Sequence, residues 1–472
     1  MTTPNTTPLL VDISAIARGA GVGQNAVSNW RKRYESFPKP VREGAGGLLF
    51  DAEQVERWLS ARGNSSGAFS ASSMFPSLLP KLRSAGLDGE RSVGFLLALL
   101  KVIRLRNQGD SEQQVALGRM WTVWSGDAEP SQAWIVAREA AAAVDQPELA
   151  ARLLDELRSV EMLPAAVRSE ALALVERATT ATDDKELLGE LFEGLRSRQG
   201  GHARFAEEFN SPSAVNRLFA GLARDVRSVF DLSCGEGGTL LAVAQAVVAR
   251  TGVKPRLYGW DLHAESIRGA EDRLWIHDFQ ATLRTLDTLQ QPPDHEQFDM
   301  VVADAPFGIR MDRRDYISDP DRWKYGAPPA SSANMAWLQL AIERLTPQGR
   351  AYVVLDGRST GAMADASIRR NLIEGGVVSA IVELPGRLYA KTTIGAVLWC
   401  LRAEPSPETG RRVLLVDASG LGSLGRTQVT LDDAEIEKLT EILKMWEDRG
   451  EMSTLTETDK IAAVVVDPDQ FD

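Results

Sequence analysis

The sequence predicts an α/β protein whose main domain is a doubly wound, mostly parallel sheet, preceded by a helical domain and a small N-terminal module. Three observations predict this fold class. From about residue 201, short apolar runs that fit buried strands alternate with helical segments, as in "SVFDLS" and "TLLAVAQAVVAR". Residues 76–200 read almost entirely as helix, rich in Ala, Leu, Glu and Arg. Residues 1–62 combine short helical segments, a glycine turn and a short strand.

The domain boundaries follow from changes in composition along the 472 residues, a length that suggests about three domains. We expect a module at 1–62, a flexible Gly/Ser linker at 63–75, a helical domain at 76–200, the α/β domain at 201–420 and a C-terminal helical extension at 421–472. No signal-peptide pattern and no apolar run of the roughly 20 residues of a membrane helix is present. The two cysteines and four histidines show no metal-ligand spacing. These features predict a cytoplasmic protein that uses neither a membrane nor a metal.

The N-terminal module has features of a DNA-binding unit. The net charge of the chain is −12, yet residues 1–63 carry eight basic against six acidic residues, which favours this segment for binding a polyanion. A helix near Ser14, a turn at 19–22, a second helix at about 24–34 and a strand at 48–50 before a third helix resemble a winged helix-turn-helix of the MerR or excisionase kind. The outer face of the second helix carries side chains that suit base edges and phosphates: Gln24, Asn25, Ser28, Asn29, Arg31, Lys32 and Arg33. The alternative is a module that docks another protein.

Acidic residues end four successive strands of the α/β region, where ligands of such sheets bind. "DLSCGEGG" follows the first strand and begins with Asp231, and its glycines allow a ligand close to the backbone at a helix N-terminus. Asp261 ends the second strand and suits the two hydroxyls of a ribose. Asp287 ends the third and suits an adenine amino group. Asp304 ends the fourth, in "VVADAPF". A single acid at a strand end is usually a cap, but four in order indicate a binding site.

In this order the segments resemble the S-adenosylmethionine-dependent methyltransferases, whose sheet is Rossmann-like, and among them the N6-adenine DNA methylases. The resemblance is greatest to the modification subunit of type I restriction-modification systems. Residues 209–212 resemble the family's FxTP element, "DLSCGEGG" its DPxCGxGG loop and "DAPF" its NPPF motif; "LPGRLYAKTTIGAVLWCL" is also typical of this subfamily. The resemblance implies S-adenosylmethionine as cofactor. The residues that would bind it are Phe209, Ser211, Pro212, Asp231, Ser233, Gly235, Gly237, Asp261 and Asp287.

The family's fourth-strand motif implies the catalytic residues. By this resemblance Asp304 accepts a hydrogen from the target amino group, Ala305 accepts the other through its carbonyl, Pro306 fixes the turn and Phe307 stacks on a flipped-out base. The sequence departs from the family at Asp304, usually Asn, at Ala305, usually Pro, and at Leu232, usually Pro.

The function that the resemblance implies is site-specific adenine-N6 methylation of DNA, with DNA and either a specificity subunit or a second copy of the chain as partners. One alternative is a DNA-binding regulator with a cofactor-binding but catalytically weak methylase-like domain, which the departures at Asp304 and Ala305 favour. Another is methylation of a protein glutamine or of RNA, which explains the N-terminal module poorly.

Overall fold

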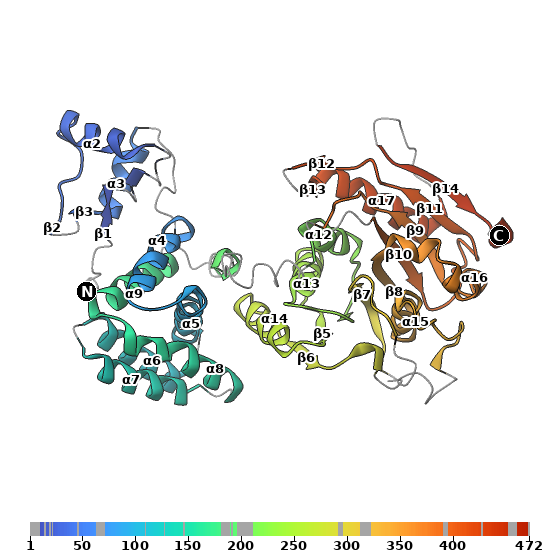
Figure 1. Cartoon of the computed structure of the whole chain (residues 1–472), viewed down its shortest axis with the longest axis horizontal. Helices are drawn as coiled ribbons and strands as arrows, with labels where there is room; N and C mark the ends of the chain where they lie inside the picture. Colours follow the sequence, from blue (N-terminus) through green and yellow to red (C-terminus); the bar gives the residue numbers. More distant parts are fainter. Residues whose placement is uncertain are drawn as a thin grey trace. The chain divides into compact units, whose positions relative to one another are not determined.

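The computed structural model (Figure 1) describes residues 10–13, 16–17, 20, 22–44, 47–62, 71–108, 110–126, 128–144, 147–180, 189, 192–195, 211–290, 296–311, 322–389, 395–425, 428–451 and 460–470. The chain divides into two compact units, Met1–Arg204 and Phe205–Asp472. In the described part of the chain, no helix is long and apolar enough to cross a lipid bilayer.

The described residues at the start of the first unit form a small module with three antiparallel strands, β1 to β3, and the helices α2 and α3. The strands pair in the order β1-β3-β2, and Phe37, Phe50 and Trp58 pack against one another at its centre. The second helix, the strand and the third helix that the sequence predicts are confirmed, whereas the predicted first helix falls largely outside the described residues. The elements are β1 (Leu10–Asp12), α2 (Gln24–Arg33), β2 (Arg42–Gly44), β3 (Gly47–Asp51) and α3 (Ala52–Ser60).

The described remainder of this unit is largely helical, as expected. Helix α4 begins at Ala71, inside the range predicted as a linker, and residues 63–70 of that range lie outside the described residues. The buried Lys101 forms an ion pair with Glu156 at 3.0 Å, which neutralises the buried charge of the lysine and ties α5 to α8. The helices are α4 (Ala71–Ser84), α5 (Gly89–Gln108), α6 (Ser111–Ser125), α7 (Pro130–Ala142), α8 (Pro147–Leu157) and α9 (Ala165–Thr180).

The second unit is built on a nine-stranded sheet, in the order β14-β11-β9-β10-β8-β7-β4-β5-β6 among the described strands. The predicted doubly wound α/β fold is confirmed. The pairs β4–β5, β4–β7, β5–β6, β7–β8 and β9–β11 are parallel, while β10 and β14 run antiparallel to their neighbours. The strands are β4 (Ser228–Asp231), β5 (Arg256–Asp261), β6 (Ala281–Thr285), β7 (Phe298–Asp304), β8 (Leu345–Asp356), β9 (Val378–Glu383), β10 (Ala396–Arg402), β11 (Val413–Asp417) and β14 (Ala462–Val466); a separate hairpin joins β12 (Ser423–Leu424) to β13 (Val429–Thr430).

Helices cover both faces of this sheet and create two apolar cores. Helices α12 (Ser213–Leu222), α13 (Gly238–Thr251), α14 (Ala264–Ile276) and α17 (Asp433–Arg449) pack on one face. Helices α15 (Asn334–Glu343) and α16 (Ala366–Glu374) pack on the other. After β4 the chain builds β5 and β6 on one side of β4, then crosses to build β7 and β8 on the other side. Sheets of this kind bind ligands where the strand order reverses, which here is at the carboxyl ends of β4 and β7, and we call this place the crevice.

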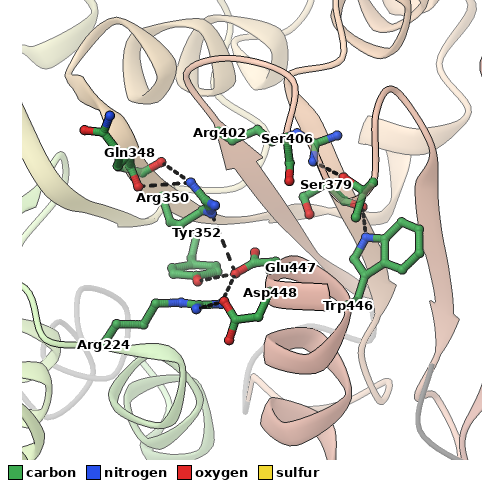
Figure 2. A network of polar contacts seen from close by, with 12 residues as sticks. Arg224, Gln348, Arg350, Tyr352, Ser379, Arg402, Ser406, Trp446, Glu447 and Asp448 are labelled. Atoms are coloured by element: carbon green, nitrogen blue, oxygen red, sulfur yellow. Dashed lines mark hydrogen bonds and ion pairs between the residues drawn. The ribbon is translucent and has the colours of Figure 1, made fainter. Parts of the chain in front are cut away.

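Helix α17 is joined to α12 and to the sheet by a buried polar network (Figure 2). Glu447 lies 3% exposed and accepts hydrogen bonds from Arg224 at 2.9 Å and from the Tyr352 hydroxyl at 3.1 Å. Arg224 follows α12 and also pairs with Asp448. Near the other end of α17, Arg217 of α12 pairs with Asp433 at 2.5 Å. Residues 421–472, expected as a helical extension, thus contribute α17 to the core and β14 to the edge of the main sheet.

Candidate active site

The glycine loop leaves β4 and enters α13 through two left-handed residues. Gly235 has φ 51° and Gly237 has φ 77°, values that favour glycine. A Cβ on Gly237 would lie 3.0 Å from the Cβ of Ala270, so the absence of a side chain also lets this loop lie against α14. The amide of Gly235 donates to Oδ2 of Asp261 at 3.0 Å, and the amide of His263 donates to Oδ1 at 2.8 Å. Asp261 therefore fixes the loop beside the carboxyl end of its own strand.

Carboxyl groups gather at these strand ends. Asp231 is 2% exposed and accepts the Ser233 amide at 3.0 Å. Burial, together with the nearby carboxylates of Asp304 and Asp261, raises the pKa of Asp231 to about 8. A group of carboxylates that repel one another in a poorly hydrated crevice favours a ligand that carries positive charge.

Asp287 and Thr288 follow β6 and turn back toward the glycine loop. The Asp287 carboxylate accepts the Leu289 amide at 3.0 Å and so begins the short 3₁₀ helix η2 (Thr288–Gln290). The Thr288 hydroxyl donates to the carbonyl of Leu232 at 2.7 Å. These bonds place the end of β6 within reach of the crevice formed by β4 and β5.

The segment Asp304-Ala305-Pro306-Phe307 leaves β7 beside the glycine loop. The Ser233 hydroxyl donates to the backbone carbonyl of Asp304 at 3.3 Å, which joins the two loops directly. Asp304 is half-buried and Ala305 is buried, and the Ala305 amide donates to the Val354 carbonyl of β8 at 3.2 Å. Pro306 is exposed and Phe307 is half-buried. The aromatic ring and the carboxyl group therefore both keep part of their surface accessible beside the glycine loop.

The segment before α12, which contains Ser211 and Pro212, lies beside the glycine loop and the segment that follows β7. The Thr239 hydroxyl of α13 donates to the Asn216 side chain at 2.8 Å and lies 3.4 Å from the Ser211 hydroxyl. Ser211 also hydrogen-bonds to the Asp304 carboxylate. Ser211 and Pro212 are thus brought to the glycine loop, whereas the predicted Phe209 lies outside the described residues.

Burial and hydrogen bonding have opposite effects on the pKa of the Asp304 carboxyl group. Loss of water raises the pKa of this carboxyl to about 6, while hydrogen bonds from Tyr389 and Ser211 oppose the rise. Tyr389, Asn216 and Thr239 were not among the residues predicted for the site. Tyr389 lies within "LPGRLYAKTT", a segment that the resemblance singled out without assigning a residue in it.

The residues predicted to bind DNA lie on one helix of the first unit. Gln24, Asn25, Asn29, Arg31, Lys32 and Arg33 are exposed and Ser28 is half-buried. Their role stays a prediction. Within the described ranges, no group of three His, Cys, Asp or Glu side chains lies close enough together to hold a metal ion.

Comparison with known proteins gives the class of this site. Residues 183–467 match the family described as N-6 DNA Methylase. Since this match covers more than half of the chain, the protein belongs to that family, which confirms the resemblance drawn from the strand-end motifs. Family membership implies S-adenosylmethionine as the cofactor.

Individual relatives agree with the family match. The chain is 27% identical over 275 residues to the type I restriction enzyme HindI methylase subunit of Haemophilus influenzae, covering 56% of this chain and 61% of that one. It is 26% identical over 278 residues to the MjaIX methylase subunit of Methanocaldococcus jannaschii, covering 56% of this chain and 50% of that one. The chain therefore spans about half to three-fifths of these relatives. The crystal structure of the type I methyltransferase subunit from Streptococcus thermophilus is similar in fold, with a TM-score of 0.61 at 21% identity over 85% of this chain and 96% of that one.

The crevice fits the implied cofactor on its own chemistry. Gly235 and Gly237 leave room against the backbone at the start of α13. Asp261 presents a carboxylate whose two oxygens each accept one backbone amide, which leaves lone pairs for ribose hydroxyls. A positively charged ligand would offset the burial and the repulsion that raise the pKa of Asp231, and so would favour its ionised form.

Proposed function

We propose that this protein transfers a methyl group from S-adenosylmethionine to N6 of adenine in DNA. The observation that carries the proposal is the hydrogen bond from Ser233 to the Asp304 carbonyl, which joins the glycine loop to the segment that would receive the target base. Donor and acceptor sites that share one crevice suit a direct transfer between two bound partners, in which positioning supplies much of the rate.

The residues of the β7 loop have the chemistry that this reaction needs. An aromatic amine is a poor nucleophile because its lone pair is delocalised into the ring. Asp304 and the Ala305 carbonyl would accept the two amino hydrogens and draw that nitrogen toward tetrahedral geometry. Phe307 would stack on the flipped-out adenine. When bound, S-adenosylmethionine supplies a methyl group on a positively charged sulfur, and Asp231, Ser233, Gly235, Gly237, Asp261 and Asp287, with Ser211 and Pro212, would hold it.

We further propose that DNA is engaged by helix α2 together with partners outside this chain. The exposed Arg31, Lys32 and Arg33 in the last turn of α2 suit phosphate contacts. A type I restriction-modification system whose complex assembly has been studied contains a chain similar in fold, with a TM-score of 0.59 at 18% identity. A specificity subunit or a second copy of this chain would then select the sequence. The family match favours the enzyme over a DNA-binding regulator.

The experiment is transfer of label from S-adenosylmethionine to unmethylated DNA of mixed sequence, with base analysis of the product. We expect label in N6-methyladenine with the wild type and a loss of about 100-fold or more with Asp304→Ala. Asp225→Ala is the matched control, because Asp225 is an exposed carboxylate that precedes β4 and so lies at the end of this strand opposite to the site. No label in DNA, or label that is indifferent to Asp304→Ala, would contradict the proposal.

A further inference from the structure

The loop after β9 brings a tyrosine hydroxyl to the target segment. This loop is shaped by Arg387, which adopts φ 59°. It is also pinned by β13, because the Val429 amide donates to the Arg387 carbonyl at 2.9 Å and the Gln428 side chain donates to the Leu388 carbonyl at 3.3 Å. Tyr389 follows directly, half-buried against the core of the α12–α17 face. The loop that bears the Tyr389 side chain is therefore fixed by hydrogen bonds on the residues just before it.

Tyr389 contacts both functional groups of the target segment. Its hydroxyl donates to Oδ1 of Asp304 at 2.5 Å. Its ring lies 4.9 Å from the ring of Phe307, centroid to centroid, at 60°. Ser211 provides a second hydrogen bond to the same carboxylate. A carboxylate accepts about four hydrogen bonds, so two donors from the protein leave capacity for an amino group.

We propose that Tyr389 is a positioning residue for methyl transfer: its hydroxyl holds the Asp304 carboxylate in the orientation that accepts the target amino group, and its ring supports Phe307. This inference rests on the proposed function. It means that the loop after β9 helps to orient the reacting groups, although Tyr389 is 85 residues from Asp304 in the sequence.

The need for such a donor follows from the acid at position 304. An amide in this place would be neutral at every pH, but a carboxyl group must be ionised to act only as an acceptor. Its surroundings are poor in water, and this loss of hydration disfavours the negative charge and raises the pKa of the carboxyl group. A phenol donates without adding a positive charge that would repel a cationic cofactor. The Tyr389 hydroxyl therefore stabilises the ionised carboxylate while leaving the potential of the crevice negative.

The test compares the wild type with Tyr389→Phe, which keeps the ring and removes only the hydroxyl. Two quantities are measured: the pKa of Asp304, from the ¹³C signal of labelled aspartate identified by its absence in Asp304→Asn, and the pH profile of label transfer to DNA. We expect a higher pKa for Asp304, an acid limb of the rate moved to higher pH, a kcat reduced about ten-fold and an unchanged KM for S-adenosylmethionine. Tyr258→Phe is the matched control, because Tyr258 packs against Phe298 in the middle of β5.

Each other outcome has a definite meaning. An unchanged pKa of Asp304 in Tyr389→Phe would overturn the proposal, as would a faster reaction, which would mean that Tyr389 competes with the target base. A wild type that transfers no label while the pKa still moves would instead contradict the proposed function. In an Asp304→Asn background the acid limb should be absent, and Tyr389→Phe should no longer shift the profile; a shift that persists there would assign the effect to another group.

Discussion

In the proposed reaction, Asp304 makes methyl transfer depend on protonation in a way that an amide would not. The carboxyl group lies at the end of β7, half-buried, and burial raises its pKa to about 6 despite two hydrogen bonds. Below that pH it becomes protonated and offers a donor to an amino group that also donates. The residue that would accept hydrogens from adenine thus works only when it is ionised.

The first prediction is an acid limb in the rate of methyl transfer. We expect kcat/KM for DNA, which reports the groups of the free protein, to fall to about a tenth of its plateau at pH 5, one unit below the pKa of Asp304, and to level off above about pH 7. Asp304→Asn should lose this limb. A profile of the same shape in both proteins would assign the titration to a different group.

The second prediction concerns Asp231 and stability. Its pKa is raised to about 8 in the folded protein, so the folded state binds a proton more tightly than the unfolded chain. The proton on Asp231 therefore stabilises the folded protein most below about pH 4, and this contribution to the free energy of unfolding is lost as the pH rises to about 8. Asp231→Asn does not titrate, so its melting temperature relative to the wild type should rise between pH 5 and pH 8 and then stay constant. A constant difference over that range would rule out the raised pKa.

At the scale of elements, the site depends on how closely helices approach the strand ends. Helix α13 starts at a left-handed glycine that touches α14, and it ends at another, Gly252, with φ 71° and open space where a Cβ would point. Helix α12, which carries the segment with Ser211, is held by ion pairs near both ends of α17. The walls of the crevice are therefore set by contacts outside it.

The third prediction compares two glycines with positive φ, of which only Gly237 also lies close to a neighbouring helix. Gly252→Ala should cost about 1 kcal/mol of stability through its positive φ and leave cofactor binding unchanged. Gly237→Ala has a similar φ but also meets Ala270 at 3.0 Å, so it should cost more and weaken binding of S-adenosylmethionine. Thermal unfolding and titration calorimetry measure the two effects. Equal losses of stability and of cofactor affinity in the two variants would mean that backbone strain alone accounts for both effects.

The fourth prediction concerns the polar network of α17. Glu447→Gln removes the buried negative charge that accepts hydrogen bonds from Arg224 and Tyr352, although Asp448 still pairs with Arg224, and should lower the free energy of unfolding by about 2 kcal/mol. Glu437→Gln, on the exposed side of the same helix, should change it by less than about 0.5 kcal/mol. Denaturant titration compares the two variants, and similar losses in both would show that the network adds little.

At the scale of the whole molecule, the sequence predicts most of the α/β architecture and part of the site. The alternation of strands and helices and the acids at 231, 261, 287 and 304 can be recognised locally, because each strand end carries its own signal. Tyr389 cannot be recognised in this way, since its contact with Asp304 depends on β10 and β8 lying between β9 and β7 in the sheet. The same holds for β14, whose pairing with β11 closes the edge of the sheet from the far end of the chain.

The fifth prediction follows from that arrangement. Removing residues 421–472 would expose the apolar surface that α17 covers, take away Leu439, Leu443 and Trp446 from the core, and leave β11 as an open edge. We expect the shortened chain to aggregate, as measured by light scattering and gel filtration. A shortened chain that stays monomeric and binds cofactor would show that this segment is dispensable for the fold.

The hydrogen bond between Ser233 and the Asp304 carbonyl has a consequence for how cofactor and DNA affect each other's binding. A ligand that restricts the motion of the glycine loop also restricts the segment that we propose faces the adenine. Occupancy of one half of the crevice should therefore change affinity at the other half, and by linkage the effect must be equal in both directions. Cofactor and DNA are then expected to bind cooperatively, with Ser233 as the link between them.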